Sequence, residues 1–255
     1  MKQLAKRLFQ SLGYDIQRRH LNHPANIGTA SRPIGSMKML LEDLHFRGFH
    51  PQSILDVGAN RADWSRMAKS IFKKADFFLI EPQIEMKSAL DAFCEEFPGS
   101  HYFLAGAGAN PGELVLTIWD DLAGSSLLPP ESEELRTEGK QRSVPIITIN
   151  SLLEENMLPM PQLVKLDIQG FELEALKGGA NLFGNVEVFI LEVSLFEFMA
   201  GQPLFAEVVT FMKNWGYLVY DFPGFLRRPY DGALGQCDIC FVKHDGFLRT
   251  KNVWS

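Results

Sequence analysis

Polar side chains that directly follow apolar runs of strand length are the residues best suited to bind a ligand. The turn DVGAN contains Gly58 and Asn60, and Glu81 follows about 23 residues beyond Gly58, at the end of the next apolar run. A glycine lets a ligand approach the backbone, and an acidic side chain at this spacing can accept hydrogen bonds from both ribose hydroxyls. Asp56, in the same DVGAN turn, and Glu81 are each, taken alone, equally well explained as a turn-former or as a solvated carboxylate. Together they favour an adenosine-containing ligand, although the further glycines of a dinucleotide fingerprint are absent.

A second group of polar residues lies in the segment VKLDIQGFE, which contains Lys165, Asp167, Gly170 and Glu172. Residues two apart on a strand point to the same face, so Lys165 and Asp167 would be buried side by side. Burying two charges is costly unless they pair or serve a site. The segment therefore predicts either a structural ion pair or part of an active site.

Elements that position these residues alternate along most of the chain. Strands are predicted over 53–60, 76–82, 101–110, 162–170 and 186–194, and helices over 62–72, 85–97, 171–183 and 205–216, with Gly178 and Gly179 ending or interrupting the third helix. Continuous apolar strands separated by helices indicate a parallel sheet covered on both faces. The last strands, 217–222 and 236–244, are joined by a loop of antiparallel type. The expected fold is α/β, a mostly parallel seven-stranded sheet with helices on both faces and an antiparallel last strand.

The alternation is interrupted between Glu113 and Asn150. Segments 113–119 and 143–149 are strand-like, and the stretch between them is polar and acidic. We expect a hairpin-like excursion with a mobile loop over 120–142 that can act as a lid. One catalytic domain is expected over 52–255, preceded by an N-terminal helical extension over 1–51.

Ligands of an open parallel sheet bind beyond the carboxyl ends of its strands. The carboxylates predicted to gather at that edge are Asp56, Glu81, Asp167 and Glu192. In contrast, His50 and His101 stand at strand beginnings, on the opposite edge, and are poor catalytic candidates.

Six motifs follow one another between Ser53 and Lys243: DVGAN, LIEP, GSSLL, TINSLL, VKLDIQGFELEALKGG and DICFV. In this combination the chain resembles the FkbM-type methyltransferases, which are S-adenosylmethionine-dependent enzymes with a Rossmann-like methyltransferase fold. The resemblance implies that the cofactor is S-adenosylmethionine and that its methionine portion lies over the turn formed by Asp56, Gly58, Ala59 and Asn60. It also implies a ribose site at Glu81 and Pro82, an adenine site beside Gly106 and Ala107, a place near the sulfonium and the acceptor for Asp167, and supporting roles for Lys165 and Glu172.

Two positions depart from the family pattern. Ala62 stands where a second glycine usually follows the asparagine, which would tighten the turn near the methionine end of the cofactor. Gln169 stands where many members have glutamate in a DxEGxE pattern. Glutamine can replace the hydrogen bonds of a glutamate, but the change weakens any role of this position as a base or metal ligand.

A methyltransferase must place the acceptor oxygen in line with the sulfonium methyl and exclude water. A hydroxyl acceptor must also lose its proton to a base. Asp167 is the first candidate for this base, Glu192 the second, and His20 or His23 the third. A divalent metal held by Asp167 and Glu192 is an alternative way to orient acceptor hydroxyls, but the ligand spacing is not tight and no metal site is predicted.

The resemblance implies O-methylation of a hydroxyl on a sugar, a glycan or a secondary metabolite. The aromatic-rich stretch 193–205 is predicted either to wall the acceptor pocket or to belong to the core. Two other functions stay open: a nicotinamide-dependent oxidoreductase, for which Glu81 is also suitable, and a non-catalytic binding protein on the same fold. The missing glycines and the absence of a Tyr-x-x-x-Lys spacing weigh against the oxidoreductase.

The composition is that of an ordinary globular domain of 255 residues, 46% hydrophobic and 22% charged. A net charge of −6 argues against a general nucleic-acid binder. No apolar run reaches the roughly 18 residues of a membrane span, no secretory signal is visible, and the expected compartment is cytoplasmic.

Two smaller features have alternative interpretations. The N-terminal segment carries Lys2, Lys6, Arg7, Arg18 and Arg19 against Asp15, and it either packs as a solvated helix or makes peripheral contact with an anionic membrane. Cys237 and Cys240 lie three apart in a predicted strand and therefore point to opposite faces. They are expected to be buried thiols rather than a zinc or redox pair.

Overall fold

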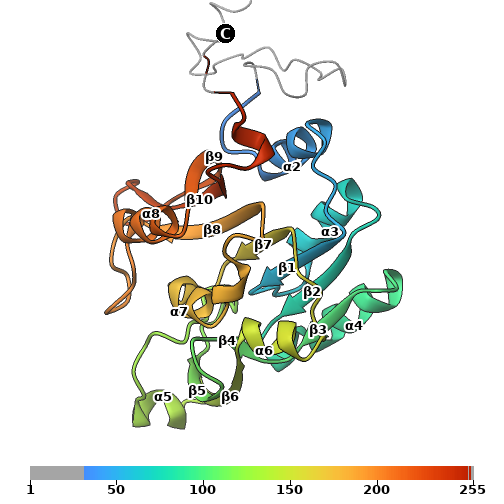
Figure 1. Ribbon diagram of the computed structural model, residues 1–255. Coiled ribbons are helices and arrows are strands. Elements are labelled where there is room, and N and C mark those ends of the chain that lie inside the picture. The colour runs from blue at the N-terminus through green and yellow to red at the C-terminus, as the bar shows by residue number, and fades with distance from the viewer. Residues whose placement is uncertain (1–31, 252, 254–255) are drawn as a thin grey trace, which may run out of the picture. The chain divides into compact units, whose positions relative to one another are not determined.

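The main sheet has seven strands in the order β3-β2-β1-β7-β8-β10-β9 in the computed structural model, which describes residues 32–251 and 253 (Figure 1). The bounds are β3 His101–Phe103, β2 Asp76–Ile80, β1 Ser53–Val57, β7 Leu163–Leu166, β8 Val188–Ser194, β10 Leu234–Lys243 and β9 Tyr217–Arg227. Strands β3 to β8 in this order are parallel, whereas β10 runs antiparallel to both β8 and β9. The mostly parallel sheet with an antiparallel strand at its end is thus confirmed.

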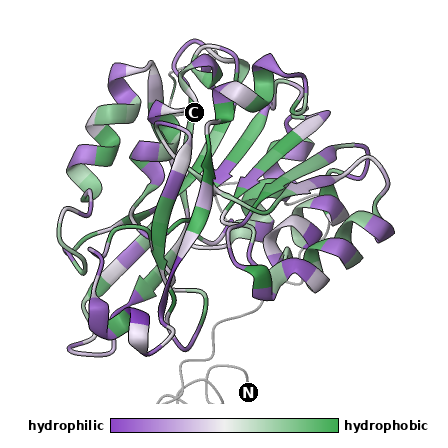
Figure 2. Ribbon diagram, turned by 90° about the horizontal axis from the view of Figure 1, so that it is seen from below, coloured by the Kyte–Doolittle hydropathy of each residue, from purple (hydrophilic) through white to green (hydrophobic). Residues whose placement is uncertain are grey.

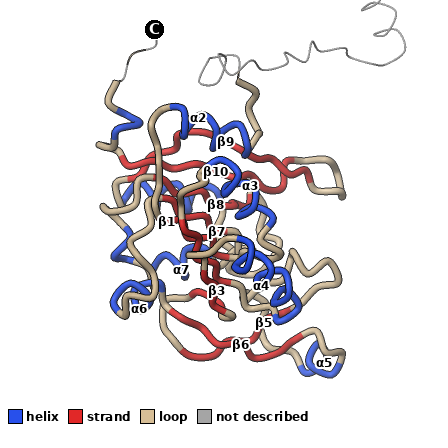
Figure 3. Tube along the Cα trace, turned by 90° about the vertical axis from the view of Figure 1, so that its right-hand side faces the viewer, coloured by secondary structure: helices blue, strands red, loops and turns tan. Residues whose placement is uncertain are grey.

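Helices cover both faces of this sheet. One core cluster joins the sheet to α6 (Ile149–Glu154), α7 (Glu172–Lys177) and α8 (Phe205–Asn214), and the other joins it to α2 (Met37–Phe46), α3 (Asp63–Ile71) and α4 (Lys87–Glu96). Figure 3 shows α6 and α7 on one side of the strands and α3 and α4 on the other. Every residue of β1 and β7 is buried, because an apolar strand between two helical layers meets no solvent on either face. The apolar strands are enclosed by helices with polar outer faces (Figure 2).

A second, three-stranded sheet has the order β4-β6-β5, with β4 at Gly106–Ala107, β5 at Gly112–Thr117 and β6 at Gln141–Ile147. Strands β5 and β6 pair antiparallel, which confirms the hairpin-like excursion. The predicted single strand over 101–110 is wrong: β3 belongs to the main sheet and β4 pairs with β6. Gly106 and Gly108 permit this change of sheet, because a Cβ on either would lie 2.8 Å from the side chain of Ile146.

The segment predicted as a loop over 120–142 contains a short helix and the start of a strand. Helix α5 spans Glu133–Thr137, and the side chain of Ser132 caps it by accepting a hydrogen bond from the backbone of Leu135. Such a cap satisfies an orphan N–H of the first turn, so the acidic run is helical at one point. The prediction of a continuous loop is therefore wrong at α5 and at the start of β6.

Three local predictions have clear outcomes. Helix α7 ends before Gly178 and a 3-10 turn, Ala180–Leu182, follows, which confirms the break at the glycine pair. Strands β9 and β10 extend beyond the predicted 217–222 and 236–244 at their shared hairpin. Cys237 and Cys240 are both buried and lie in the clusters on opposite faces of the sheet, as expected.

The N-terminal predictions are only partly accessible. Helix α2 lies within the compact unit Pro33–Ser255, and its Leu40, Leu41 and Leu44 are buried in the core. The division of the chain at residue 51 stays a prediction. The basic residues up to Arg19 and both His20 and His23 lie outside the described residues. None of the described helices combines the length and the hydropathy that a membrane-spanning segment requires.

Candidate active site

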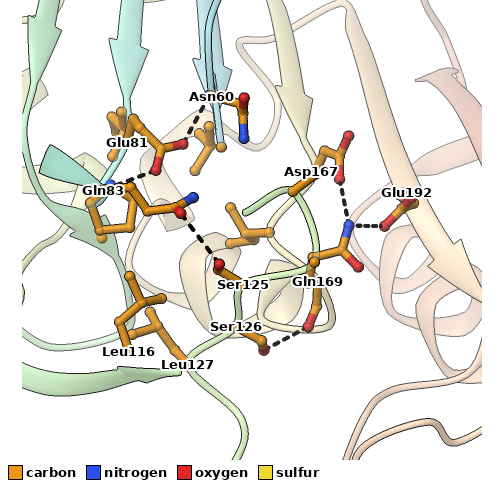
Figure 4. Close-up of a pocket in the computed structure, with 18 of the residues that line it drawn as sticks. Asn60, Glu81, Gln83, Leu116, Ser125, Ser126, Leu127, Asp167, Gln169 and Glu192 are labelled. Atoms are coloured by element: carbon orange, nitrogen blue, oxygen red, sulfur yellow. Dashed lines mark hydrogen bonds between the residues drawn. The ribbon is translucent and has the colours of Figure 1, made fainter. Parts of the chain in front are cut away.

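A pocket of about 340 Å³ lies at the carboxyl ends of β1, β2, β7 and β8. Segments that are far apart in the sequence line it together (Figure 4). What we call the β1–β2 wall consists of Gly58, Asn60, Glu81, Pro82 and Gln83, and the β7–β8 wall consists of Asp167, Ile168, Gln169, Glu192 and Gln236. The cover segment, residues 121–127 between β5 and β6, contributes Asp121, Gly124, Ser125, Ser126 and Leu127. Gly106 and Ala107 of β4 also line the pocket.

The β1–β2 wall is held by backbone hydrogen bonds. The N–H of Gly58, at φ +81°, donates to the carbonyl of Ile80 over 2.8 Å. The carboxylate of Glu81 accepts from the backbone N–H of Asn60 at 2.8 Å and of Gln83 at 2.9 Å. A Cβ at Gly58 would lie 2.0 Å from the backbone oxygen of Asp167, so this turn also abuts the opposite wall.

Burial raises the pKa of Glu81, although the two backbone N–H donors partly oppose the rise. Asp56 lies beneath the pocket and does not line it, because its side chain is fully buried at the end of β1. Its carboxylate accepts from Ser65 Oγ at 2.6 Å and lies 3.8 Å from Lys165 Nζ. Burial raises the pKa of Asp56, and the Lys165 ammonium acts in the opposite direction.

The β7–β8 wall is built from side chains. Lys165 Nζ donates to Asp167 Oδ2 at 3.1 Å, so the two residues pair, although only the lysine is buried and the side chain of Asp167, just beyond β7, is 32% exposed. The turn beyond them is fixed by Glu172, whose Oε1 accepts from the backbone N–H of Ile168 at 2.9 Å and of Gly170 at 3.2 Å. Burial is the largest cause that raises the pKa of Glu172, to about 7.

Glu192 has neutral hydrogen-bond donors. Its Oε2 accepts from Gln169 Nε2 at 2.8 Å, and the same nitrogen also donates to Asp167 at 3.1 Å (Figure 4). Gln236 Nε2 donates to Glu192 Oε2 as well, at 3.0 Å. Burial, together with the charges of Asp167 and Glu172, raises the pKa of Glu192 to about 9. This rise in pKa favours the protonated form of the carboxyl group.

The cover segment is tied to both walls. Ser126 Oγ donates to the backbone oxygen of Gln169 at 2.8 Å. On the other side, Gln83 Nε2 donates to the carbonyl of Leu122 at 3.1 Å, and Ser125 Oγ donates to Gln83 Oε1 at 3.3 Å. A displacement of either wall should therefore also displace the cover segment.

Eight of the sequence-predicted site residues line this one pocket: Gly58, Asn60, Glu81, Pro82, Gly106, Ala107, Asp167 and Glu192. Asp56 and Ala59 do not line it, and neither does any residue of the aromatic stretch 193–205. His101 begins β3, and His50 precedes β1, so both lie at the opposite edge as expected. Within 32–251 and 253, no group of three His, Cys, Asp or Glu side chains is arranged to hold a metal ion. The roles assigned to these residues stay predictions.

Sequence reasoning missed Gln83 and Gln236, whereas Ser125 and Ser126 belong to the GSSLL motif that it singled out in the predicted lid. Gln83 directly follows Pro82 at the end of β2, so its position beside Glu81 was a usable signal. Gln236 could not be found in this way, because it enters the pocket from the beginning of an antiparallel strand.

Comparisons with known proteins identify the family. Residues 56–219 match the family described as the methyltransferase FkbM domain. The chain is 26% identical over 158 residues to the hexuronic acid methyltransferase AglP of Haloferax volcanii, a match that covers 62% of this chain and only 60% of that curated relative. Among solved structures, a methyltransferase FkbM from Methylobacillus flagellatus has a TM-score of 0.49 at 15% identity, covering 85% of this chain and 50% of that one. A Burkholderia thailandensis 1,6-didemethyltoxoflavin-N1-methyltransferase, solved with S-adenosylhomocysteine, has a TM-score of 0.44 at 10% identity and covers 82% and 78%.

The family match starts in β1 and ends in β9, so it contains both walls of the pocket except Gln236. Because it covers well over half of the chain, this protein belongs to the FkbM methyltransferase family.

Proposed function

We propose that this protein transfers a methyl group from S-adenosylmethionine to a hydroxyl oxygen of a sugar unit. The observation that carries the proposal is the pairing of two unlike walls in one pocket. One wall presents Glu81, a buried carboxylate held by two backbone amides, and the other presents Asp167 and Glu192. Membership of the FkbM family supports the methyltransferase activity, and the name of the relative, a hexuronic acid methyltransferase, supports a sugar acceptor.

The β1–β2 wall fits the cofactor by its chemistry. Glu81 has lone pairs left to accept the ribose hydroxyls, Gly58 allows close approach to the backbone, and Gly106 and Ala107 offer a flat surface for adenine. A volume of about 340 Å³ is within the usual range for a small-molecule pocket. When bound, S-adenosylmethionine supplies an electrophilic methyl group on a positively charged sulfonium, to which a pocket lined by carboxyl groups is electrostatically complementary.

The β7–β8 wall supplies the proton chemistry that a hydroxyl acceptor needs. Asp167, paired with Lys165, accepts the proton that the acceptor oxygen loses. Glu192, whose pKa is raised by burial, donates a hydrogen bond from its protonated carboxyl group that orients the acceptor. The cover segment excludes water from the reacting atoms.

The charges of the pocket favour a neutral part of the sugar as the acceptor. No lysine or arginine is among the described residues that line the pocket, whereas Asp121 and Asp167 are. A carboxylate placed against the β7–β8 wall would be repelled and would lack a cationic partner. We therefore place a hydroxyl, rather than the carboxyl group of a uronic acid, at the methylated position.

Two measurements test the proposal. Calorimetry and thermal unfolding should show that S-adenosylmethionine and S-adenosylhomocysteine bind and stabilise the protein, whereas NAD⁺ does not. Equal stabilisation by NAD⁺ would favour an oxidoreductase instead. Labelled methyl transfer to a panel of hexoses and hexuronic acids should then give a product stable to mild alkali, as a methyl ether is. An alkali-labile product would identify a methyl ester and contradict the hydroxyl acceptor, and binding without any transfer would favour a binding protein.

A further inference from the structure

The amide group of Gln169 occupies the space between two carboxyl groups. Its single nitrogen donates to Asp167 Oδ1 at 3.1 Å and to Glu192 Oε2 at 2.8 Å, so both of its hydrogens are used (Figure 4). Bridging two carboxyl groups from different strands is also what a divalent cation with oxygen ligands does. In this pocket, a neutral amide takes that position.

The position of this amide is fixed from both ends of the residue. The backbone of Gln169 is left-handed, with φ +53°, and its carbonyl accepts from Ser126 Oγ at 2.8 Å. At the other end, Gln236 Nε2 from β10 donates to the same oxygen of Glu192, at 3.0 Å, and lies 3.5 Å from Gln169 Oε1. The two glutamines and the two carboxyl groups thus form one closed network.

The cationic side chain of this region is already engaged. Lys165 lies 3.1 Å from Asp167 and 3.8 Å from Asp56. Among the described residues, no lysine or arginine forms an ion pair with Glu192. Asp167 is therefore paired with a lysine, whereas Glu192 accepts hydrogen bonds from the neutral amides of the two glutamines.

We propose that Gln169 is a positioning residue whose amide, instead of a divalent cation, holds Asp167 and Glu192. Methyl transfer by this protein therefore needs no such cation. A carboxylate at position 169 would convert the same network into a divalent-cation site, with Asp167, Glu192 and the new side chain as oxygen ligands. The statement about methyl transfer rests on the proposed function, whereas the statement about cation binding concerns the hydrogen-bond network alone.

Manganese binding to the full chain, followed by electron paramagnetic resonance and calorimetry, tests the inference. Wild type should bind no Mn²⁺ below millimolar concentrations. Gln169→Glu should bind one Mn²⁺ with a dissociation constant on the order of 10⁻⁴ M or tighter. Gln52→Glu, which makes the same change of charge at an exposed residue before β1, should behave as wild type does.

A second variant keeps the test decisive if Gln169→Glu fails to fold. Gln169→Ala adds no charge and leaves Asp167 and Glu192 facing an empty space, so it should gain weaker Mn²⁺ binding. Wild type binding Mn²⁺ as tightly as the variants, or neither variant binding more than Gln52→Glu, would overturn the inference. Loss of wild-type transfer in the presence of EDTA would also overturn it.

S-adenosylhomocysteine binding, measured on the same samples, separates the two proposals. Wild type that fails to bind it contradicts the proposed function, whereas the Mn²⁺ titrations still decide the role of Gln169.

Discussion

The two walls of the pocket are built in different ways. In the β1–β2 wall, a single carboxylate is held by backbone N–H groups whose positions follow from the fold. In the β7–β8 wall, the carboxyl groups are held by the side chains of Lys165, Gln169 and Gln236. A backbone donor survives almost any substitution of its own side chain, whereas a side-chain donor is lost with one change. The β1–β2 wall is therefore suited to a constant ligand, and the β7–β8 wall is the one whose chemistry a single residue can alter.

Removing the carboxylate of Asp167, in the β7–β8 wall, should have the largest effect on methyl transfer. Asp167→Asn keeps the shape but removes the proton acceptor, and we expect methyl transfer to fall by about 10²–10⁴-fold. S-adenosylhomocysteine affinity, measured by calorimetry, should remain, because it depends mainly on the other wall. Turnover at the wild-type rate would remove Asp167 from the mechanism.

Changing Glu81 should instead impair cofactor binding. Hydrogen bonds to a charged group contribute about 1.5–3 kcal/mol, so Glu81→Gln should weaken S-adenosylhomocysteine binding roughly 10-fold to 150-fold. The matched control is Glu85→Gln, which removes an ion pair with Arg142 outside the pocket. Equal affinities for wild type and Glu81→Gln would show that the ribose is held elsewhere.

The pH dependence of stability should come from the β7–β8 wall. The pKa of Glu192 is about 9 in the folded state, against an ordinary value of 4.5, so between these pH values the native state holds a proton that the unfolded chain has lost. The free energy of unfolding therefore decreases as pH rises through this window. One proton corresponds to about 1.4 kcal/mol per pH unit, so this group contributes a decrease of at most about 2 kcal/mol between pH 6.5 and 8.

Urea unfolding of Glu192→Gln at the two pH values measures this contribution. The variant imitates the protonated carboxyl group and should lose less stability than wild type over the same interval. Glu133→Gln, at an exposed glutamate in α5, should keep the wild-type slope. A slope shared by all three proteins would mean that Glu192 is already ionised at neutral pH.

The sequence predicted the β1–β2 wall better than the β7–β8 wall, for the same physical reason. Gly58, Asn60 and Glu81 end consecutive parallel strands, so the position of each along the chain predicts its place at the sheet edge. The side chain of Asp56 points to the face of β1 where Ser65 and Lys165 pack against it. The sequence does not predict this face, because β1 is buried on both sides and its residues therefore show no alternation between apolar and polar. Gln236 joins the pocket only because β10 is inserted between β8 and β9. This strand order is determined by tertiary packing, and no local sequence pattern predicts it.

The smallest effect is expected at Ala62, which is in the left-handed conformation, with φ +62°, and fully buried beside the β1–β2 wall. Glycine at this position would relieve about 1–2 kcal/mol of backbone strain. It would also lose a buried methyl group worth about 0.8 kcal/mol and about 0.4–1 kcal/mol through the greater freedom of the unfolded chain. These terms nearly cancel, so Ala62→Gly should change the free energy of unfolding by less than about 1 kcal/mol. The reverse change in the same turn, Gly58→Ala, should be strongly destabilising, because its Cβ would lie 2.0 Å from a backbone oxygen that cannot move without displacing Asp167. Chemical denaturation of the two variants compares them directly. If Ala62→Gly were the more disruptive, the β1–β2 wall would depend on side-chain packing as much as the β7–β8 wall does, and the contrast between the walls would be wrong.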